Sequence, residues 1–292
     1  MRFTFAEAMT RTENYVPLAQ AAEAAGYTSM TVSDSLIYPK ESTTQYPYNG
    51  TGDREFLEDK DFIETMILCA HIFAQTEKIR LTPFVLKLPV RPPVLLAKQA
   101  ASVAVLSNNR LGLGVGLSPW PEDFMAMGVP WERRGKRMDE CMEIFKGLTN
   151  GGYFGYEGEF FSLEPLKQQP VPTAPIPLLV GGHADAALRR AVRRGDGWMH
   201  AGGDADELDR MLARLQEIRA EENDTRDNFE VHVISMDAYS VDGVKRLEDK
   251  GVTDCIVGFR MPYVKGVDDE PVQTKVDAMN RFADKVISKV NG

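Results

Sequence analysis

The chain has 292 residues, and its 34 Lys and Arg against 43 Asp and Glu give a formal net charge of −9. This acidic balance argues against a general nucleic-acid or anionic-membrane surface, and no stretch approaches the ~18 consecutive apolar residues that span a bilayer. The first residues lack a basic segment followed by an apolar run, so we expect a cytoplasmic protein with neither nucleic acid nor membrane as a partner.

Strand and helix patterns alternate along the first half of the chain. Residues 27–33 (YTSMTVS) are rich in β-branched residues and deliver Asp34 and Ser35 to the carboxyl end of a strand. Residues 36–60 show no periodicity, and a loop of this length inside a compact domain is usually a functional lid or a disordered segment. The other predicted elements are a strand at residues 3–8, helices at 15–25, 61–75 and 94–106, and strands at 79–86 and 111–116.

The second half continues this alternation. A helix from residue 138 and a small hairpin within 153–163 precede strands at 178–180, 198–201, 229–235 and 254–259, each followed by a helix. Eight such units predict one α/β domain over residues 1–292, a (β/α)8 TIM barrel with insertions after strands two and four and around residues 150–176. The helix at 94–106 is apolar on almost every side and is expected to be buried as a crossover helix. The long loops after strands two, four and eight would all lie on the same face.

Two glycine-rich segments follow or form strands. LLVGGH at residues 178–183 runs into a helix, where free backbone N–H groups suit an anion such as a phosphate; a tight turn without a ligand explains the motif about equally well. The glycines at 112, 114 and 116 lie within a strand, whereas a dinucleotide-binding fingerprint places its glycines in a turn between a strand and a helix. We therefore reject a Rossmann fold. We expect these glycines to leave space for something flat and large above them.

Metal catalysis has no support in the sequence. Neither HExxH nor CxxC nor clustered carboxylates occur, so no metal is predicted, and no GxSxG elbow marks a nucleophile. His71 and His232 are interpreted as structural, whereas His183 and His200 fall at strand ends and are better candidates for ligand contact. Three cysteines are expected to be buried and free, namely Cys69, Cys141 and Cys255.

Two long segments carry a family resemblance. Residues 79–140 (IRLTPFVLKLPVRPPVLLAKQAASVAVLSNNRLGLGVGLSPWPEDFMAMGVPWERRGKRMDE) and 175–198 (PIPLLVGGHADAALRRAVRRGDGW) strongly resemble the bacterial luciferase-like flavin superfamily. More narrowly, they resemble its branch of coenzyme F420-dependent oxidoreductases. The resemblance implies a (β/α)8 barrel, usually paired as a homodimer, with a flat deazaflavin lying across the carboxyl ends of the strands.

The resemblance also implies where the cofactor lies. A bulge in the third strand, often containing a non-prolyl cis peptide, would support the ring from behind, and Asp34 would approach the polar edge of the ring. The cofactor-binding positions implied in this sequence are Asp34, the bulge residues Pro83, Phe84 and Val85, the ring and ribityl neighbours Gly116, Leu117 and Ser118, and the phosphate turn Gly181, Gly182 and His183.

The sequence departs from the sugar-phosphate dehydrogenases of that branch at two catalytic positions. Their catalytic histidine corresponds to Ser35, and the acid after their fourth strand corresponds to Pro119. We therefore expect a reductase in which Asp34 and Ser35 are the candidate catalytic residues and the reduced coenzyme donates hydride to a small electron-poor substrate under the loop at 36–60. Candidate walls of the substrate site are Tyr38, Tyr46, Tyr48 and Trp120.

Three other functions stay open. An FMN-dependent monooxygenase would use the same scaffold, but FMN ends at one phosphate, whereas the anionic tail of F420 should need cations such as Lys87, Arg91 and Arg260 near the mouth of the site. A non-catalytic flavin-binding homologue would explain why the catalytic histidine and acid are replaced by Ser35 and Pro119. A hydrolase on a bare barrel is the weakest alternative, because no paired carboxylates are visible at strand ends.

Overall fold

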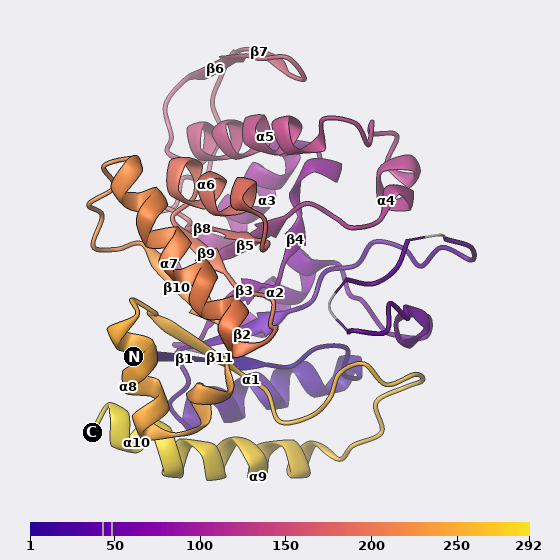
Figure 1. Cartoon of the computed structure of the whole chain (residues 1–292). Coiled ribbons are helices and arrows are strands. Elements are labelled where there is room, and N and C mark those ends of the chain that lie inside the picture. The colour runs from indigo at the N-terminus through magenta and orange to yellow at the C-terminus, as the bar shows by residue number, and fades with distance from the viewer. Residues whose placement is uncertain (43, 48) are drawn as a thin grey trace.

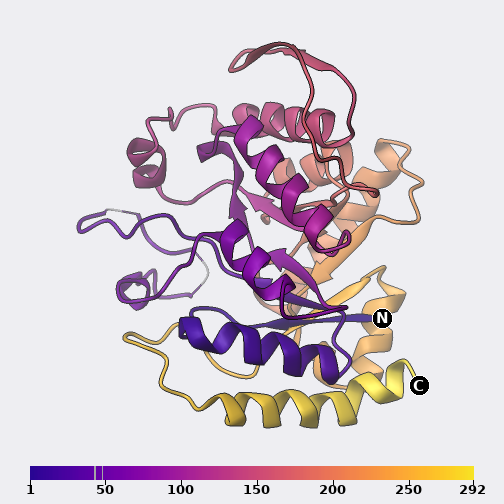
Figure 2. The same cartoon turned by 180° about the vertical axis from the view of Figure 1, so that it is seen from behind.

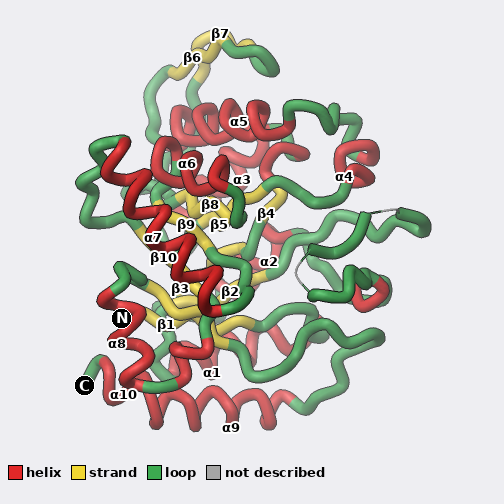
Figure 3. The backbone as a smooth tube through the Cα atoms, viewed as in Figure 1, coloured by secondary structure: helices red, strands yellow, loops and turns green. Residues whose placement is uncertain are grey.

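The protein is a closed barrel of parallel strands surrounded by helices (Figures 1 and 3). The computed structural model describes every residue except 43 and 48. Its main sheet has the order β3-β2-β1-β11-β10-β9-β8-β5-β4, and all of its paired neighbours are parallel. A parallel bridge between Leu81 and Leu111 joins β3 to the segment before β5, so the sheet closes. The predicted (β/α)8 architecture is confirmed.

The barrel strands are β1 (Arg2–Ala6), β2 (Ser29–Val32), β3 (Arg80–Pro83), β4 (Leu86–Lys87), β5 (Leu113–Gly116), β8 (Leu178–Gly181), β9 (Gly197–Met199), β10 (Glu230–Val233) and β11 (Asp254–Val257). The helices are α1 (Tyr15–Ala24), α2 (Thr65–Phe73), α3 (Pro93–Leu106), α4 (Pro121–Ala126), α5 (Arg134–Thr149), α6 (Asp185–Arg194), α7 (Ala205–Glu221), α8 (Val241–Asp249), α9 (Val272–Phe282) and α10 (Ser288–Val290). The predicted hairpin around residue 155 is β6 (Phe154–Glu157) and β7 (Ser162–Leu166), an antiparallel pair that projects from the barrel at the top of Figure 1.

Three differences from the predicted elements have local causes. The strand expected at residues 79–86 is divided into β3 and β4 by a bulge at residues 83–85. The helix expected at 61–75 begins only at Thr65, because the side chain of Glu64 accepts the N–H groups of Met66 and Ile67 and caps α2 there. The charged segment at 121–137 contains the short helix α4, which the sequence did not indicate.

The expectation that α3 would be buried on almost every side is wrong for its outer face. Leu95 and Leu106 are 53% and 81% exposed, and Ile67 on the neighbouring α2 is 64% exposed. The inner face of α3 packs on the barrel as a crossover helix should. In Figure 2, which shows the molecule from behind, α2 and α3 cover this side of the barrel next to one another.

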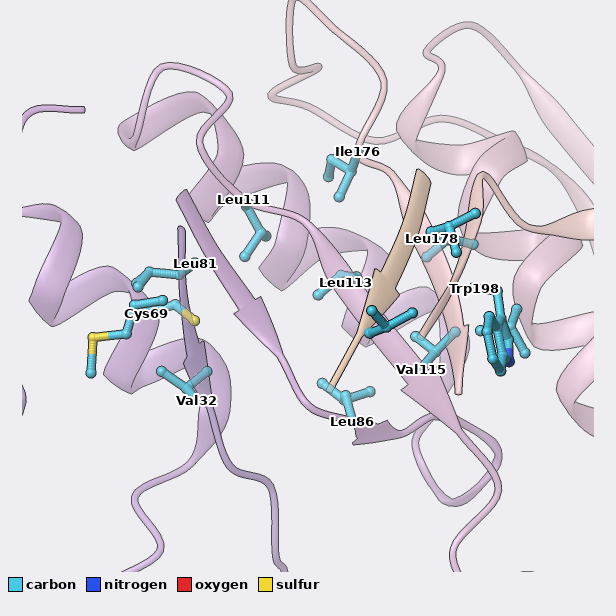
Figure 4. Close-up of a cluster of buried hydrophobic side chains, with 14 of the residues drawn as sticks. Val32, Cys69, Leu81, Leu86, Leu111, Leu113, Val115, Ile176, Leu178 and Trp198 are labelled. Carbon is cyan, nitrogen blue, oxygen red and sulfur yellow. The ribbon is translucent and has the colours of Figure 1, made fainter. Parts of the chain in front are cut away.

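The hydrophobic core lies between the strands and the surrounding helices. Figure 4 shows Leu113, Val115, Leu178 and Trp198 of adjacent strands in this layer, and all four side chains are fully buried. The three cysteines are free and buried, as predicted. Within the described part of the chain, no helix is long and apolar enough to cross a membrane.

Candidate functional site

The predicted site residues gather at the carboxyl ends of the barrel strands. Because all barrel strands are parallel, the segments that follow them emerge at one end of the barrel. The long loops after β2, β5 and β11 extend together on the right of Figure 1, which confirms the predicted common face. This end is called the mouth below.

The bulge at residues 83–85 fills the space left by glycines in the adjacent strands. Its peptide bond between Phe84 and Val85 is cis, at the position that the resemblance implied. A Cβ atom on Gly116 would lie 2.7 Å from the Val85 side chain, and one on Gly181 would lie 2.9 Å from it. A Cβ on Gly114 would collide with the carbonyl oxygen of Pro83. The glycines of β5 therefore make room for the bulge, which corrects the expectation that they leave space for a ligand.

The bulge presents an apolar surface at the mouth. Phe84 and Val85 are partly exposed and pack on a small cluster inside the barrel formed by Leu179, Met199 and Ile256. This inner cluster is fully buried and supports the bulge from below. A flat apolar ring would be supported by this surface in the way that the resemblance implies.

The turn after β8 offers backbone donors beside this surface. Gly182 has φ +128°, which favours glycine, and Trp198 Nε1 donates a 2.8 Å hydrogen bond to its carbonyl oxygen. The N-terminus of the ten-residue helix α6 follows directly. After the neighbouring strand β9, Gly202 and Gly203 form a second turn with positive φ. Two glycine turns and a helix N-terminus are an arrangement that suits a phosphate.

His200 lies against this turn with one unpartnered ring nitrogen. Its ring stacks on that of His183 with centroids 4.8 Å apart, and Ala201 donates its N–H to His183 Nε2 over 3.2 Å. Burial and the adjacent His183 lower the pKa of His200 to about 4, so the ring is neutral at pH 7. Its Nδ1 lies 3.2 Å from the Ile234 carbonyl oxygen and is assigned as the donor, which leaves the buried Nε2 as an acceptor without a partner. A cofactor hydroxyl beside the phosphate turn fits this acceptor.

The neutral His200 should make the protein acid-sensitive. Its folded pKa of about 4 lies below the ordinary 6.5, so the unfolded chain binds more protons between these values. The stabilisation is complete above pH 6.5 and is lost as the pH falls toward 4. The free energy of unfolding should fall between pH 7 and pH 4 in both proteins, but by ~2 kcal/mol less in His200→Gln than in the native protein. Urea unfolding at the two pH values measures this difference. Equal losses for both proteins would contradict this assignment.

Asp34 is held by protein groups at the end of β2. Its carboxylate forms a two-pronged ion pair with Arg91 at 2.6 and 3.0 Å, and its side chain is 2% exposed. It also accepts the Thr65 hydroxyl at 2.7 Å and the Lys87 backbone N–H at 2.9 Å. A direct contact with a cofactor ring, as the resemblance implies, would require this pair to open. The neighbouring Ser35 is partly exposed, and its hydroxyl makes only a long 3.4 Å bond to the Ile37 carbonyl oxygen.

A second buried ion pair lies at the base of the loop after β5. Lys87 Nζ is 2.7 Å from Asp123 Oδ2, and both side chains are at most 9% exposed. Ser118 donates its hydroxyl to the same carboxylate oxygen at 2.5 Å and accepts the backbone N–H of Trp120 at 2.9 Å. Ser118 therefore fixes the backbone at Trp120, whereas Gly116 and Leu117 lie at the mouth as expected. Asp123 was missed because the sequence did not indicate the short helix α4 in which it lies.

A third group of charges fixes the loop after β11. Arg260 donates to Glu7 Oε1 at 2.7 Å, and Lys275 Nζ lies 3.1 Å from the same atom. Lys275 also contacts Asp268 Oδ2 at 2.5 Å, and all of these side chains except that of Arg260 are at most 5% exposed. Glu7, Asp268 and Lys275 were not predicted, because the sequence does not show that residues 268 positions apart meet.

The three cations expected to be available to an anionic cofactor tail are already paired. Lys87 binds Asp123, Arg91 binds Asp34, and Arg260 binds Glu7. The structure thus places them near the mouth as predicted, but each one is neutralised by a buried carboxylate.

Four aromatic side chains join the three loops over the mouth. Tyr46 of the loop after β2 stacks with Trp120 at 6.3 Å and contacts Phe56 at 5.1 Å. Tyr263 of the loop after β11 lies 5.7 Å from Tyr46 and 5.1 Å from Phe56. These four residues are called the aromatic cluster. Phe56 and Tyr263 were missed from the sequence.

Two other tyrosines predicted as walls of the substrate site lie elsewhere or cannot be placed. Tyr38 lies outside the aromatic cluster, under the guanidinium of Arg54 at 4.7 Å. Tyr48 lies outside the described residues.

A buried polar cluster closes the opposite end of the barrel. Glu230, His232 and Asp254 bring their side chains together there, with His232 Nε2 2.7 Å from Glu230. Arg2 and Arg80 pair with these carboxylates at 2.6 to 3.1 Å. Burial alone would raise the pKa of Glu230, but the His232 hydrogen bond and the arginine charges lower it to about 2. Two guanidinium groups already balance the two carboxylates, which is consistent with the structural interpretation of His232.

Comparisons with known proteins agree with the geometry. The family model described as luciferase-like monooxygenase matches residues 3–248. An uncharacterized protein of Mycobacterium tuberculosis (strain ATCC 25618 / H37Rv) is 61% identical over 290 residues, covering 99% of this chain and 100% of its own. Two solved structures share the fold at 15% and 16% identity with TM-scores of 0.75 and 0.74, each covering 99% of both chains. They are the monooxygenase RslO1 from Streptomyces bottropensis and the coenzyme F420-dependent tetrahydromethanopterin reductase from Methanopyrus kandleri.

Proposed function

Because this chain belongs to the luciferase-like monooxygenase family, we propose that it is an F420-dependent oxidoreductase that acts as a reductase on a small organic substrate. One observation supports reduction of the substrate over its oxidation. Glu7, Asp34 and Asp123, which follow β1, β2 and β5 at the mouth, are each engaged by a lysine or arginine side chain, so none of these three carboxylates stands free as a base. Oxidation of an alcohol needs a base for the hydroxyl proton, whereas reduction of an electron-poor substrate can take its proton from water.

The residues at the mouth fit a flat cofactor with a phosphate. Backbone N–H groups of Gly182 and His183, in the turn just before α6, would bind the phosphate, and the unpartnered Nε2 of His200 would accept a cofactor hydroxyl. Phe84 and Val85 would support the ring from below. When bound, the reduced deazaflavin supplies the hydride. The chain's own contribution is to orient the ring and to exclude water from one of its faces.

The proposed reaction can be tested with reduced F420 and an activated alkene under anaerobic conditions. We expect the purified protein to oxidise the coenzyme only when the acceptor is present, which restores the visible absorbance of oxidised F420. Oxidation that is no faster than without protein would contradict the proposal. Binding of the coenzyme without turnover would identify a non-catalytic homologue instead.

One observation favours an FMN-dependent monooxygenase as the second candidate. Lys87, Arg91 and Arg260 are paired with carboxylates, so the anionic tail of F420 gains no partner from them. FMN ends in a single phosphate and would need only the turn after β8. Oxygen-dependent turnover with reduced FMN, and none with reduced F420, would move the protein to this function.

We also propose that the protein is a homodimer through α2 and α3. These two helices contain one charged residue, Lys98, and their exposed side chains include Ile67, Leu95 and Leu106. An apolar face of this kind typically marks a protein interface. Light scattering after size exclusion should give the dimer mass for the native protein and for Lys245→Glu on α8, and the monomer mass for Leu95→Glu. A monomeric native protein would contradict the proposal.

A further inference from the structure

We propose that the mouth takes a substrate that carries a carboxylate, and that Lys60 binds this group. The inference rests on the proposed function for the reaction, and it adds a charged group to the substrate. Two observations carry it. Lys60 belongs to a partly buried group of charges with more cations than buried carboxylates, and this group lies across the barrel from the turn that would hold the cofactor phosphate.

Lys60 lies where the loop after β2 meets the loop after β11. Its ammonium group donates to the carbonyl oxygen of Gly266, and the residue is only partly exposed. An ammonium group has three N–H donors, so this contact leaves two of them for solvent or a ligand. Among the residues that the structure describes, no carboxylate forms an ion pair with Lys60. Its charge is therefore not neutralised by direct contact.

The two buried carboxylates nearby are already shared by two other cations. Glu7 Oε1 lies 2.7 Å from Arg260 Nε and 3.1 Å from Lys275 Nζ. Asp268 Oδ2 lies 2.5 Å from Lys275 Nζ and 3.6 Å from the Arg260 guanidinium. With Lys60, three cations therefore stand against two buried carboxylates, which leaves one positive charge in excess.

The more exposed acids nearby do not cancel this excess. Asp59 is exposed and the side chain of Glu270 is 37% exposed, so water screens both charges. Burial and the positive charge of Arg260 lower the pKa of Lys60, and the nearby carboxylates do not reverse this shift. A cation held beside a like charge is stabilised when an anion binds to it.

The strand order places this excess charge across the barrel from the cofactor phosphate. Glu7 follows β1, Arg260 follows β11 and Lys60 belongs to the loop after β2, and these three strands are adjacent. The turn after β8 is separated from them by β9 and β10 on one side and by β3, β4 and β5 on the other. In Figure 1, β1 and β11 lie in the lower half of the barrel and β8 in the upper half. The anionic tail of F420 continues from the phosphate and would lead away from Lys60, so the anion at Lys60 belongs to the substrate.

The size of the excess charge indicates a carboxylate. One carboxylate balances one positive charge, whereas a phosphate monoester carries about −1.5 to −2 at pH 7. Lysine presents its charge as a compact point with rotatable donors and needs no two-pronged geometry. We therefore expect an electron-poor acceptor that also carries a carboxylate, such as an unsaturated acid.

Calorimetric titration measures this preference separately from turnover. The purified protein, with and without oxidised F420, is titrated with cinnamate and with cinnamamide, which have nearly the same shape and differ in charge. Oxidised F420 has no hydride to give, so both probes stay intact. We expect cinnamate to bind at least ~10-fold more tightly than cinnamamide in one or both forms, and to bind more weakly as the salt concentration rises.

Three variants assign this preference to Lys60. Lys60→Met should weaken cinnamate binding ~10-fold and leave cinnamamide binding unchanged, whereas Lys60→Arg should retain the preference. Lys265→Met is the matched control, because Lys265 joins the same two loops through Glu55 at 2.8 Å. This control should leave the affinity for both probes unchanged.

Several outcomes would overturn the inference. They are equal or tighter binding of cinnamamide, binding of neither probe, and a loss of the preference in Lys265→Met. Equal weakening of both probes in Lys60→Met, or no effect of this substitution, would also overturn it, because Lys60 would then only hold the two loops together. A failure of F420 to bind would be seen in a separate cofactor titration and would count against the proposed function alone.

Discussion

Replacing Arg91 by alanine is expected to lower the free energy of unfolding by about 3–5 kcal/mol. The substitution removes the partner of Asp34, whose carboxylate is 2% exposed and lies 2.6 Å from the guanidinium. A carboxylate left in this position keeps only the Thr65 hydroxyl and the Lys87 N–H. Because Asp34 begins the loop after β2, the base of that loop should loosen as well.

The measurement is urea unfolding of Arg91→Ala beside a matched exposed pair. Arg193 pairs with Glu222 at 2.7 Å, but their side chains are 48% and 29% exposed, so Arg193→Ala should cost less than about 1 kcal/mol. The double variant Asp34→Leu with Arg91→Met should lose less than Arg91→Ala alone, since no unpaired charge remains. Similar costs for Arg91→Ala and Arg193→Ala would show that the buried pair does not hold the loop.

Gly114→Ala is expected to damage both stability and cofactor binding. Its added methyl group would meet the Pro83 carbonyl oxygen and lie 2.5 Å from the Met199 sulfur, so the bulge would have to move. Overpacking of this kind costs about 1–3 kcal/mol. The displaced bulge carries Phe84 and Val85, which form the surface under the cofactor, so we expect F420 binding to weaken at least ~10-fold.

Gly135→Ala provides the control for this substitution. Gly135 lies in α5, and a Cβ there would meet only the flexible end of Arg190 at 3.1 Å. This variant should bind F420 as the native protein does and should be no less stable, because alanine favours a helix. Unchanged F420 affinity in Gly114→Ala would show that the bulge does not support the cofactor.

The barrel could be predicted from the sequence because each of its units is locally encoded. Apolar strands, helix-ending glycines and the nearly charge-free α3 gave the order of elements, and that order leaves few topologies. The division of β3 from β4 was not encoded locally. Residues 79–86 read as one continuous strand, and only the family resemblance indicated a bulge at Pro83, Phe84 and Val85.

The site was predictable where it depends on backbone conformation and not where it depends on pairing. Gly181 and Gly182 indicated the turn after β8, because paired glycines directly before a helix usually form a tight turn. The pairing of Lys87 with Asp123, and of Glu7 with Lys275, joins residues 36 and 268 positions apart. The residues around a lysine or arginine in the sequence do not show whether its side chain already pairs with a distant carboxylate. For this reason Lys87, Arg91 and Arg260 were named as candidates for binding a ligand, although each is paired in the structure.

The central claim, that this protein uses a deazaflavin, is tested most directly by titrating the purified apo-protein with F420 and FMN in parallel and following the fluorescence of each chromophore. We predict saturable, tight binding of F420 and negligible binding of FMN. Tight binding of FMN with negligible binding of F420 would contradict the account and assign the protein to the flavin-dependent monooxygenases of its family.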